Sequence, residues 1–313
     1  MLRQWAAEAK FAMRIVVLTP NANLDVGKLW ETQMPTIDAQ VHCYERDHPG
    51  RPWVERLTGP PEVTGADMVK AMDDVGVDGA ILVSAWTMYR YDDSYALDVH
   101  EAYPDRFALV KPIDPDDEGA AETISDWAGR DGTVGVRIMM RSGVSKVADD
   151  PGIDRICEAA GRHGLPLNLA CSGRLSQVGL MAARHPNTRI VVDHLGVKQP
   201  QHPPVPEAPF AFLPELLNLA QHDNIVVKVT GACTLSRQAF PFDDIWDPLA
   251  RIFDAFGFER CLWGTDWTRA INMVSYRDGV EPFRLTDQLS ESERKMLMGD
   301  SLQQVYGWTP GGR

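Results

Sequence analysis

Three things are scarce in this 313-residue sequence: cysteine, basic residues and long apolar runs. Its five cysteines are scattered and form no Cys-x-x-Cys pair, so we expect a reduced, cytoplasmic protein. Acidic residues outnumber basic ones, and the formal net charge of −13 argues against nucleic acid or an anionic membrane as a partner. No apolar run approaches the roughly 18 residues that span a bilayer. These absences leave a globular protein with a small-molecule partner, and they leave a homo-oligomer open.

A dinucleotide-binding glycine motif is also absent after the first apolar run, which counts against an open, doubly wound sheet. Instead, short β-branched runs alternate with amphipathic stretches from Thr36 onward. Such alternation predicts parallel strands joined by helices. Eight units in about 270 residues predict an α/β fold of the (β/α)8 TIM-barrel type. The predicted strands are 36–44, 78–85, 107–114, 133–140, 165–173, 188–196, 224–232 and 260–267.

The stretches between these runs have the periodicity of helices. Apolar residues recur at three- and four-residue spacing, and several stretches stop at Gly or before Pro. Three longer irregular stretches follow predicted strands 1, 6 and 8, where a barrel keeps its active-site loops. The clearest predicted helices are 66–76, 154–164, 175–186 and 245–257, and the irregular stretches are 45–63, 198–210 and 268–284.

The first 33 residues do not share this plan. Residues 34–313 are predicted to form a single TIM-barrel domain. Residues 1–33 are either an N-terminal extension or an upstream translation of a gene whose start is Met34. The second interpretation is favoured, because nothing before Met34 matches the repeating pattern.

Polar side chains gather at the predicted carboxyl ends of the strands, where the neighbouring positions are apolar. In the first strand Asp38, Gln40 and His42 occupy alternate positions, so all three are expected on one face. Because the carboxyl ends of barrel strands surround one mouth, we expect a shared active site there. The other members of the set are Arg137 and Arg141 at strand 4, Asp193 and His194 at strand 6, and Asp266 at strand 8.

This set of residues suits the attack of water on a carbonyl carbon. Asp266 is predicted to accept the proton of water as general base. His42 and His194 are predicted to donate hydrogen bonds to the carbonyl oxygen and to stabilise its developing charge. Arg137 and Arg141 suit the bidentate grip of a substrate carboxylate.

Taken singly, several of these residues also have a purely structural explanation. Arg137 could form a salt bridge across strands, Asp266 could cap a helix, and Lys228 could pair with a carboxylate inside the barrel. The aromatic stretch 86–91 is better explained as a packed loop than as part of the site. The further candidates for a substrate pocket are Gln40, Trp86, Thr87, Tyr89, Tyr91 and Lys111.

The motifs IDAQVH, GVRIMM, VVDHLG and LWGTDW resemble, in order and spacing, those of the "amidohydrolase 2" group of barrel hydrolases. That group includes sugar lactonases, 2-pyrone-4,6-dicarboxylate lactonase, sulfomuconolactone hydrolase, galactarolactone isomerase and barrel decarboxylases. The resemblance runs from about Thr36 to Trp308. It implies that Asp266 is the general base, that His194 lies near the scissile carbonyl, and that Arg137 contacts an anionic substrate.

The resemblance leaves the metal open. His42 is the second histidine of the group's His-x-His motif, but Gln40 stands in place of the first, and strand 5 has no histidine. If zinc or another divalent metal binds, its ligands would be His42, His194 and Asp266, with Cys171 as a conceivable fourth. The loss of an imidazole favours a site without metal or other cofactor, and the resemblance supports this, because some members of the group work without metal.

The leading hypothesis is a lactonase that opens an anionic lactone, in the catabolism of aromatic or sugar acids. A metal-free lactone isomerase is the first alternative, and Gln40 is the feature that raises it. A metal-dependent decarboxylase is the second. A barrel without catalysis, acting as a binding protein, is the non-enzyme alternative, and the joint presence of His194 and Asp266 argues against it.

Overall fold

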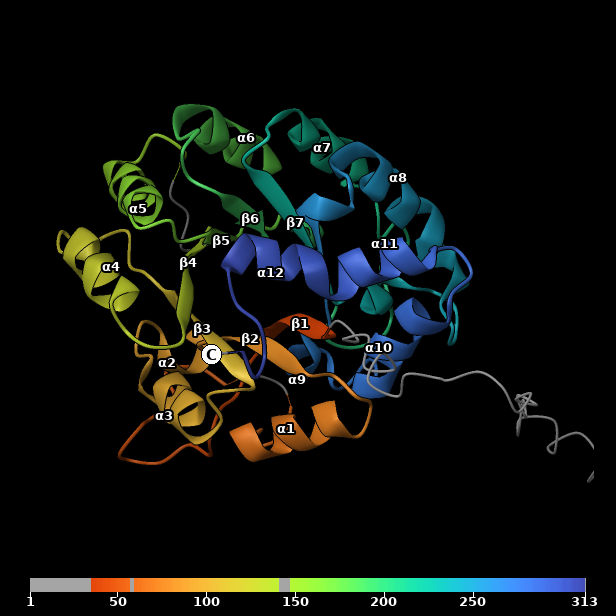
Figure 1. Cartoon of the computed structure of the whole chain (residues 1–313), viewed down its shortest axis with the longest axis horizontal. Helices are drawn as coiled ribbons and strands as arrows, with labels where there is room; N and C mark the ends of the chain where they lie inside the picture. Colours follow the sequence, from red (N-terminus) through yellow and green to blue (C-terminus); the bar gives the residue numbers. More distant parts are fainter. Residues whose placement is uncertain (1–34, 57–58, 141–146, 313) are drawn as a thin grey trace, which may run out of the picture. The chain divides into compact units, whose positions relative to one another are not determined.

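Eight parallel strands alternate with helices in the computed structural model, which describes residues 35–56, 59–140 and 147–312. Each strand pairs with the next in parallel, from β1 to β8 in chain order, and all eight predicted strands are confirmed (Figure 1). The strands are β1 Ile37–Val41, β2 Gly79–Val83, β3 Phe107–Pro112, β4 Thr133–Met139, β5 Leu167–Ala170, β6 Ile190–Val192, β7 Ile225–Thr230 and β8 Cys261–Gly264. The predicted (β/α)8 TIM barrel is therefore confirmed.

The four helices predicted from periodicity are present, with ends that differ by up to three residues. They are α1 Gly65–Asp73, α5 Pro151–Arg162, α6 Leu175–Arg184 and α8 Trp246–Phe256. The stretch 268–284, expected to be irregular, is largely helical, because a capping box of Ser275 and Asp278 starts a helix inside it. The other helices are α2 Trp86–Tyr89, α3 Ser94–Ala102, α4 Ala120–Ala128, α7 Leu213–Asn218, α9 Trp267–Ala270, α10 Tyr276–Leu285, α11 Glu291–Lys295 and α12 Ser301–Tyr306.

Two layers of apolar side chains hold the barrel together. One layer packs the outer face of the strands against the helices, and the other fills the barrel from inside. The inner layer includes Leu302, Val305 and Tyr306 of α12, and the Tyr306 hydroxyl donates to Asn168 Oδ1 at 2.6 Å. α12 therefore packs on the interior at the amino ends of the strands, and leaves the carboxyl ends to the polar residues.

The seam between β8 and β1 is joined by Asp38 rather than by a ladder of strand pairs. Its carboxylate accepts the Thr265 N–H at 2.9 Å, the Thr265 hydroxyl at 2.6 Å and the Tyr276 hydroxyl at 3.2 Å. The Asp266 N–H also donates to the Gln40 carbonyl at 3.0 Å across the same seam. These bonds set the end of β8 beside the end of β1.

The predicted N-terminal extension, residues 1–33, lies outside the described residues. Among the residues that the structure does describe, no helix has both the length and the apolar character needed to cross a membrane.

Candidate active site

β1 delivers Gln40 and His42 to the barrel interior, but not Asp38. The pairing of β1 with β2 shifts register between Asp38 and Val41, and this irregularity interrupts the alternation of side chains. The prediction that Asp38, Gln40 and His42 share one face was therefore wrong for Asp38, which faces Thr265 and Tyr276 instead. Burial raises the pKa of Asp38 to about 6, although the hydrogen bonds from its neighbours oppose that rise.

The three predicted catalytic side chains meet at the carboxyl ends of the strands. His42 Nε2 lies 3.4 Å from Asp266 Oδ1, and His194 Nδ1 lies 3.6 Å from Asp266 Oδ2. The carboxylate is fully buried, whereas the imidazole side chains are 11% and 13% exposed. The two histidines thus separate Asp266 from solvent, and a substrate would reach the imidazoles first.

Sharp turns of the backbone after β6 and β8 present His194 and Asp266 to this point. His194 and Asp266 have left-handed φ angles of 53° and 47°, and so does Leu195 at 58°. Such angles are uncommon for residues with a Cβ and are concentrated at functional sites. They explain why β6 ends at Val192 and β8 at Gly264, earlier than the apolar runs in the sequence predicted.

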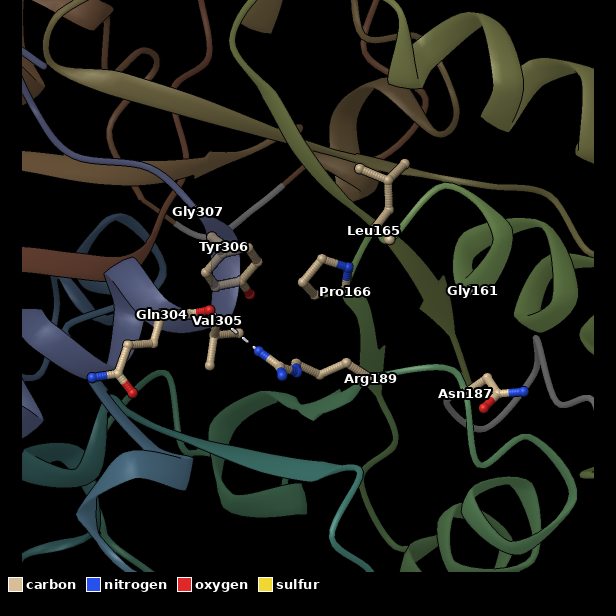
Figure 2. A pocket seen from close by; sticks show the side chains of 10 residues that line it. Gly161, Leu165, Pro166, Asn187, Arg189, Gln304, Val305, Tyr306 and Gly307 are labelled. Carbon is tan, nitrogen blue, oxygen red and sulfur yellow. Dashed lines mark hydrogen bonds between the residues drawn. The ribbon is translucent and has the colours of Figure 1, made fainter. Parts of the chain in front are cut away.

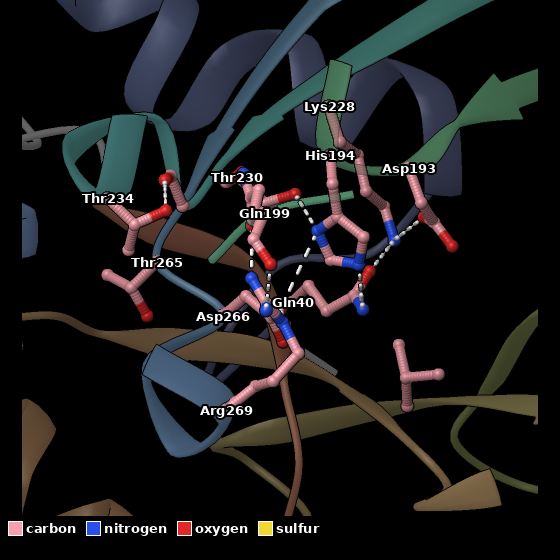
Figure 3. A network of polar contacts seen from close by, with 12 residues as sticks. Gln40, Asp193, His194, Gln199, Lys228, Thr230, Thr234, Thr265, Asp266 and Arg269 are labelled. Carbon is pink, nitrogen blue, oxygen red and sulfur yellow. Dashed lines mark hydrogen bonds and ion pairs between the residues drawn. The ribbon is translucent and has the colours of Figure 1, made fainter. Parts of the chain in front are cut away.

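The Gln40 amide lies between His42 and His194, and Figure 3 shows its contact with His194. Its nitrogen is 3.4 Å from His42 Nε2 and 3.2 Å from His194 Nε2, and its oxygen accepts the Lys228 ammonium at 3.0 Å. An ammonium can only donate, so the amide oxygen faces Lys228 and the amide N–H groups face the imidazoles. Each Nε2 is therefore an acceptor with no proton of its own.

The other ring nitrogens complete this assignment. His42 Nδ1 lies 2.6 Å from the carbonyl oxygen of Val83, which can only accept, so Nδ1 carries the proton. His194 Nδ1 lies 2.8 Å from Thr230 Oγ1 and next to Asp266. Burial lowers the pKa of His194 to about 4, against the pull of Asp266 and Asp193. The network therefore places the proton of a neutral ring on Nδ1 in both histidines.

Arg269 binds the far side of the Asp266 carboxylate, and sequence reasoning missed it. Its Nε donates to Asp266 Oδ2 at 2.6 Å, and its other nitrogens donate to the backbone and side-chain oxygens of Gln199. Burial acts to raise the pKa of Asp266, but the contacts with His194, Arg269 and His42 hold it well below its usual range. The signal in the sequence was the three-residue spacing from Asp266, which places Arg269 one helical turn along α9.

A second buried ion-pair group lies deeper in the barrel. Arg137 Nε is 2.8 Å from Asp193 Oδ2, and Lys228 Nζ is 3.1 Å from Asp193 Oδ1. The expected carboxylate partner of Lys228 is confirmed and is Asp193. Arg137 forms the cross-strand salt bridge that was its structural explanation, also with Asp193. Burial raises the pKa of Asp193, but Lys228 and Arg137 outweigh it and lower the pKa to about 2. The Nε of Arg137 is thus bound within the protein, while Arg141 lies outside the described residues.

The remaining pocket candidates make contacts of their own with other parts of the protein. Lys111 is on the helix-facing side of β3, where its ammonium pairs with Asp93 at 3.0 Å and lies 5.2 Å from the Trp127 ring centroid. Its neighbours Ala108 and Val110 take the inward positions, so the prediction of Lys111 as a pocket residue was wrong.

The aromatic stretch after β2 is a packed loop, as its structural explanation proposed. Tyr89 packs in a cluster with Tyr44, and its hydroxyl accepts the N–H of Glu45 at 3.1 Å. The Arg90 guanidinium lies 4.1 Å from the centroid of the Trp86 ring, and Trp86 itself is buried. Through these contacts Trp86 and Tyr89 stabilise the loop that follows β2.

The charge balance of the site favours an anion. Three cationic groups (Arg137, Lys228 and Arg269) face two carboxylates (Asp193 and Asp266), which leaves one positive charge in excess when both imidazoles are neutral. A positive charge in a buried site raises the local concentration of anionic ligands and opposes the entry of cations.

A resident divalent metal does not fit this arrangement. Zinc needs lone pairs from about three side chains that converge on one point, but the Gln40 N–H groups occupy the lone pairs of both Nε2 atoms. Burial raises the pKa of the Cys171 thiol to about 12, which keeps it protonated and unsuited to the role of ligand. Within residues 35–56, 59–140 and 147–312, no group of three His, Cys, Asp or Glu side chains is placed to hold a metal ion.

A surface pocket lies at the other end of the barrel (Figure 2). Leu165 and Pro166 precede β5, Arg189 precedes β6, and Gln304 belongs to α12, so the pocket borders the amino ends of the strands. The Arg189 guanidinium donates to the Gln304 carbonyl at 3.3 Å. The pocket has no acid–base pair among its lining residues, and the chemistry therefore belongs at the opposite mouth.

With this geometry established, comparison with known proteins identifies the class. The sequence pattern of the Amidohydrolase family matches residues 37–308, so this chain belongs to the amidohydrolase family and is a hydrolase of that kind. A 4-sulfomuconolactone hydrolase of Hydrogenophaga intermedia is 25% identical over 261 residues, which are 79% of this chain and 80% of the relative. An L-fucono-1,5-lactonase of Burkholderia ambifaria is 28% identical over 245 residues, which are 74% of this chain and 79% of the relative.

Solved structures agree on the fold. A protein of Acinetobacter baumannii assigned as a 2-pyrone-4,6-dicarboxylic acid hydrolase, with citric acid bound, superposes with a TM-score of 0.72 at 16% identity. The match covers 88% of this chain and all of that chain. An amidohydrolase of Burkholderia multivorans with bound zinc superposes with a TM-score of 0.71 at 22% identity, over 87% of this chain and 99% of that chain. This protein therefore shares its fold with a protein that was solved with bound zinc.

Proposed function

We propose that this protein is a metal-independent lactonase that opens an anionic lactone by attack of water on the ring carbonyl. The observation that carries the proposal is the unit formed by Asp266 and His42. Asp266 Oδ2 is bound to Arg269, whereas Oδ1 has no hydrogen-bond partner among the described residues and lies 3.4 Å from His42 Nε2. A carboxylate with one open oxygen beside an unprotonated imidazole nitrogen is an acceptor for the proton of water.

In the proposed reaction the attacking water loses a proton to the Asp266–His42 unit while its oxygen bonds to the carbonyl carbon. The tetrahedral intermediate then collapses, and the bond to the ring oxygen breaks. The imidazolium returns the proton to that oxygen as it leaves. One water is consumed and one open hydroxy acid is formed, which releases a proton when its carboxyl group ionises.

The tautomers refine the roles of the two histidines. In the neutral rings each Nε2 accepts a hydrogen bond, so neither ring can donate to a carbonyl oxygen at the start of the reaction. Once a ring holds the proton from water, its Nε2–H becomes a donor. We therefore propose that His42 and His194 act first as acceptors and then, in the protonated form, stabilise the oxyanion and the leaving oxygen.

The substrate is proposed to carry a carboxylate or a similar anionic group. The excess positive charge from Arg137, Lys228 and Arg269 supports this choice. Two of the similar proteins are named for substrates of this kind, a sulfomuconolactone and a pyrone dicarboxylate. The acyclic product is more negative than the lactone by one charge, which the same surplus stabilises.

The test is proton release, followed with a pH indicator across lactones with and without carboxylate groups, using protein treated with EDTA. We expect acid production that survives EDTA and prefers the anionic lactones. Asp266→Asn should lower kcat by roughly a thousandfold with the fold preserved. Asp254→Asn, an exposed position on α8, is the matched control and should be unchanged.

Other outcomes would redirect the assignment. Activity that disappears with EDTA and returns with zinc would overturn the metal-independent mechanism. A lactone consumed without proton release, with a second lactone visible by NMR, would identify an isomerase instead of a hydrolase. Carbon dioxide among the products would identify a decarboxylase.

A further inference from the structure

Lys228 is fully buried in the barrel and has two polar partners there. Its ammonium lies 3.1 Å from Asp193 Oδ1 and 3.0 Å from Gln40 Oε1. The first contact belongs to a structural ion pair, but the second reaches the catalytic histidines through a single side chain. Figure 3 shows this path from Lys228 through Gln40 to His194.

The Gln40 amide has two possible orientations, and Lys228 selects one of them. A carboxamide rotated by half a turn exchanges its oxygen and its NH2 group with little change in shape. With the oxygen toward the histidines, each Nε2 would need a proton in order to donate to it. With the oxygen toward Lys228, each Nε2 is left as an acceptor.

His194 is the ring whose proton depends on this choice. His42 Nδ1 is fixed as a donor by the Val83 carbonyl at 2.6 Å, whatever the amide does. His194 Nδ1 faces the Thr230 hydroxyl at 2.8 Å, and a hydroxyl can either donate or accept. The Asp266 carboxylate, 3.6 Å from His194 Nδ1, also favours a proton on Nδ1, and the Gln40 amide is the group that acts on His194 Nε2 directly.

We infer that Lys228 is a positioning residue, which holds the Gln40 amide so that His194 Nε2, next to the acceptor His42 Nε2, stays unprotonated and ready to accept a proton. The inference rests on the proposed function, because hydrolysis is the reaction that needs these two acceptors. Lys228 touches neither water nor substrate in this scheme, and it acts through Gln40 alone.

The experiment is NMR of 15N-labelled histidine in the protein without substrate, which reads the tautomer of each ring directly. In the wild type, His194 Nε2 should resonate as an unprotonated nitrogen. In Lys228→Met that nitrogen should shift toward the protonated range, and kcat should fall by roughly tenfold or more with KM nearly unchanged. His100, whose Nδ1 lies 2.8 Å from the Phe107 carbonyl, is the internal control and should not shift.

Gln40→Glu is the second variant, and it guards against misfolding of Lys228→Met. It removes only the N–H donors, and the new carboxylate can still accept from Lys228. It should likewise move His194 Nε2 into the protonated range. Lys70→Met, which removes an exposed lysine of α1, is the control for charge and should match the wild type in both measurements.

An unprotonated His194 Nε2 in both folded variants would overturn the inference. The proposed function fails separately: absence of lactone hydrolysis in the wild type would reject the lactonase, whereas the tautomer shifts need no substrate.

Discussion

The Asp266 carboxylate is bound by a guanidinium at Oδ2, where His194 also lies, and has the His42 imidazole next to Oδ1. Arg269 Nε, at 2.6 Å, keeps the carboxylate ionised and fixes Oδ2, so that only Oδ1 is left to exchange a proton. The same arginine reaches Gln199 in the loop after β6. One side chain thus sets both the charge and the direction of the proposed base.

Arg269→Met should lower kcat by about tenfold to a hundredfold, because a paired charge next to a buried carboxylate is lost. It should also move the pKa of Asp266 upward, since burial is then opposed by the histidines alone. Steady-state kinetics of hydrolysis measures the first effect. Arg277→Met, which removes an exposed arginine of α10, is the control, and equal kinetics in the two variants would contradict a role for Arg269.

At this scale, the sequence predicted the residues that follow strands and missed those that arrive through tertiary contacts. His42, His194 and Asp266 were predictable, because strand ends in a barrel share a mouth. The position of Arg269 was not predictable, because it depends on the path of α9. The outward direction of the Asp38 side chain was not predictable either, because it depends on a register shift in β1.

The junction of β1 and β8 is the element on which the position of Asp266 depends. Gly264 ends β8, and a Cβ at this position would lie 2.6 Å from Thr230 Cγ2, 2.7 Å from Asp38 Oδ1 and 2.9 Å from the Ala39 nitrogen. All three neighbours belong to strands of the barrel, Thr230 to β7 and both Asp38 and Ala39 to β1. The glycine therefore permits the close approach that lets Asp38 bind the next residue, Thr265.

Gly264→Ala should destabilise the protein by about 1–3 kcal/mol or more, as expected for an added methyl group in a packed interior. Urea unfolding followed by tryptophan fluorescence measures this. Gly129→Ala is the matched control, because the nearest atom to the added Cβ would be the Asp126 carbonyl oxygen at an ordinary 3.6 Å, and it should change stability little. A Gly264 variant as stable as this control would show that the seam can relax.

Apolar periodicity predicted which strands and helices exist, but it did not predict where several of them end. Periodicity treats VVDHLG as a continuous strand, whereas left-handed angles at His194 and Leu195 end β6 at Val192. In the same way, the stretch 268–284 has few long apolar runs, yet the capping box at Ser275 starts a helix there. Local steric demands of the site and side-chain caps decide such ends, and periodicity does not encode them.

For the whole molecule, the barrel was predictable because eight repeats of one pattern permit few topologies. The charge of the mouth was not predictable from the net charge of −13, because that value sums the whole chain, whereas the site is set by the ion pairs of Arg137, Lys228 and Arg269 with two carboxylates. A protein that is acidic overall can thus hold one excess positive charge at its site.

The dependence of stability on pH provides a test of the molecule as a whole, because two buried groups act in opposite directions. The pKa of His194 is lowered from 6.5 to about 4. Its contribution to the free energy of unfolding is therefore fully present above pH 6.5 and is lost as the pH falls toward 4. The pKa of Asp38 is raised from 3.8 to about 6, so its burial costs most above pH 6 and that cost disappears as the pH falls toward 3.8. Each effect amounts to about 3 kcal/mol, and the two nearly cancel between pH 6.5 and 4.

Single variants should therefore reveal slopes that the wild type hides. Asp38→Asn keeps the acceptor for the Thr265 N–H and should lose about 3 kcal/mol more than the wild type on going from pH 6.5 to pH 4, because only the His194 effect remains. His194→Gln should gain about as much relative to the wild type over the same range. Urea unfolding at several pH values measures both, and the double variant is the control, since its profile should be as flat as that of the wild type. If Asp38→Asn instead followed the wild type at every pH, burial would not raise the pKa of the Asp38 carboxyl group, and the expected cancellation would be wrong.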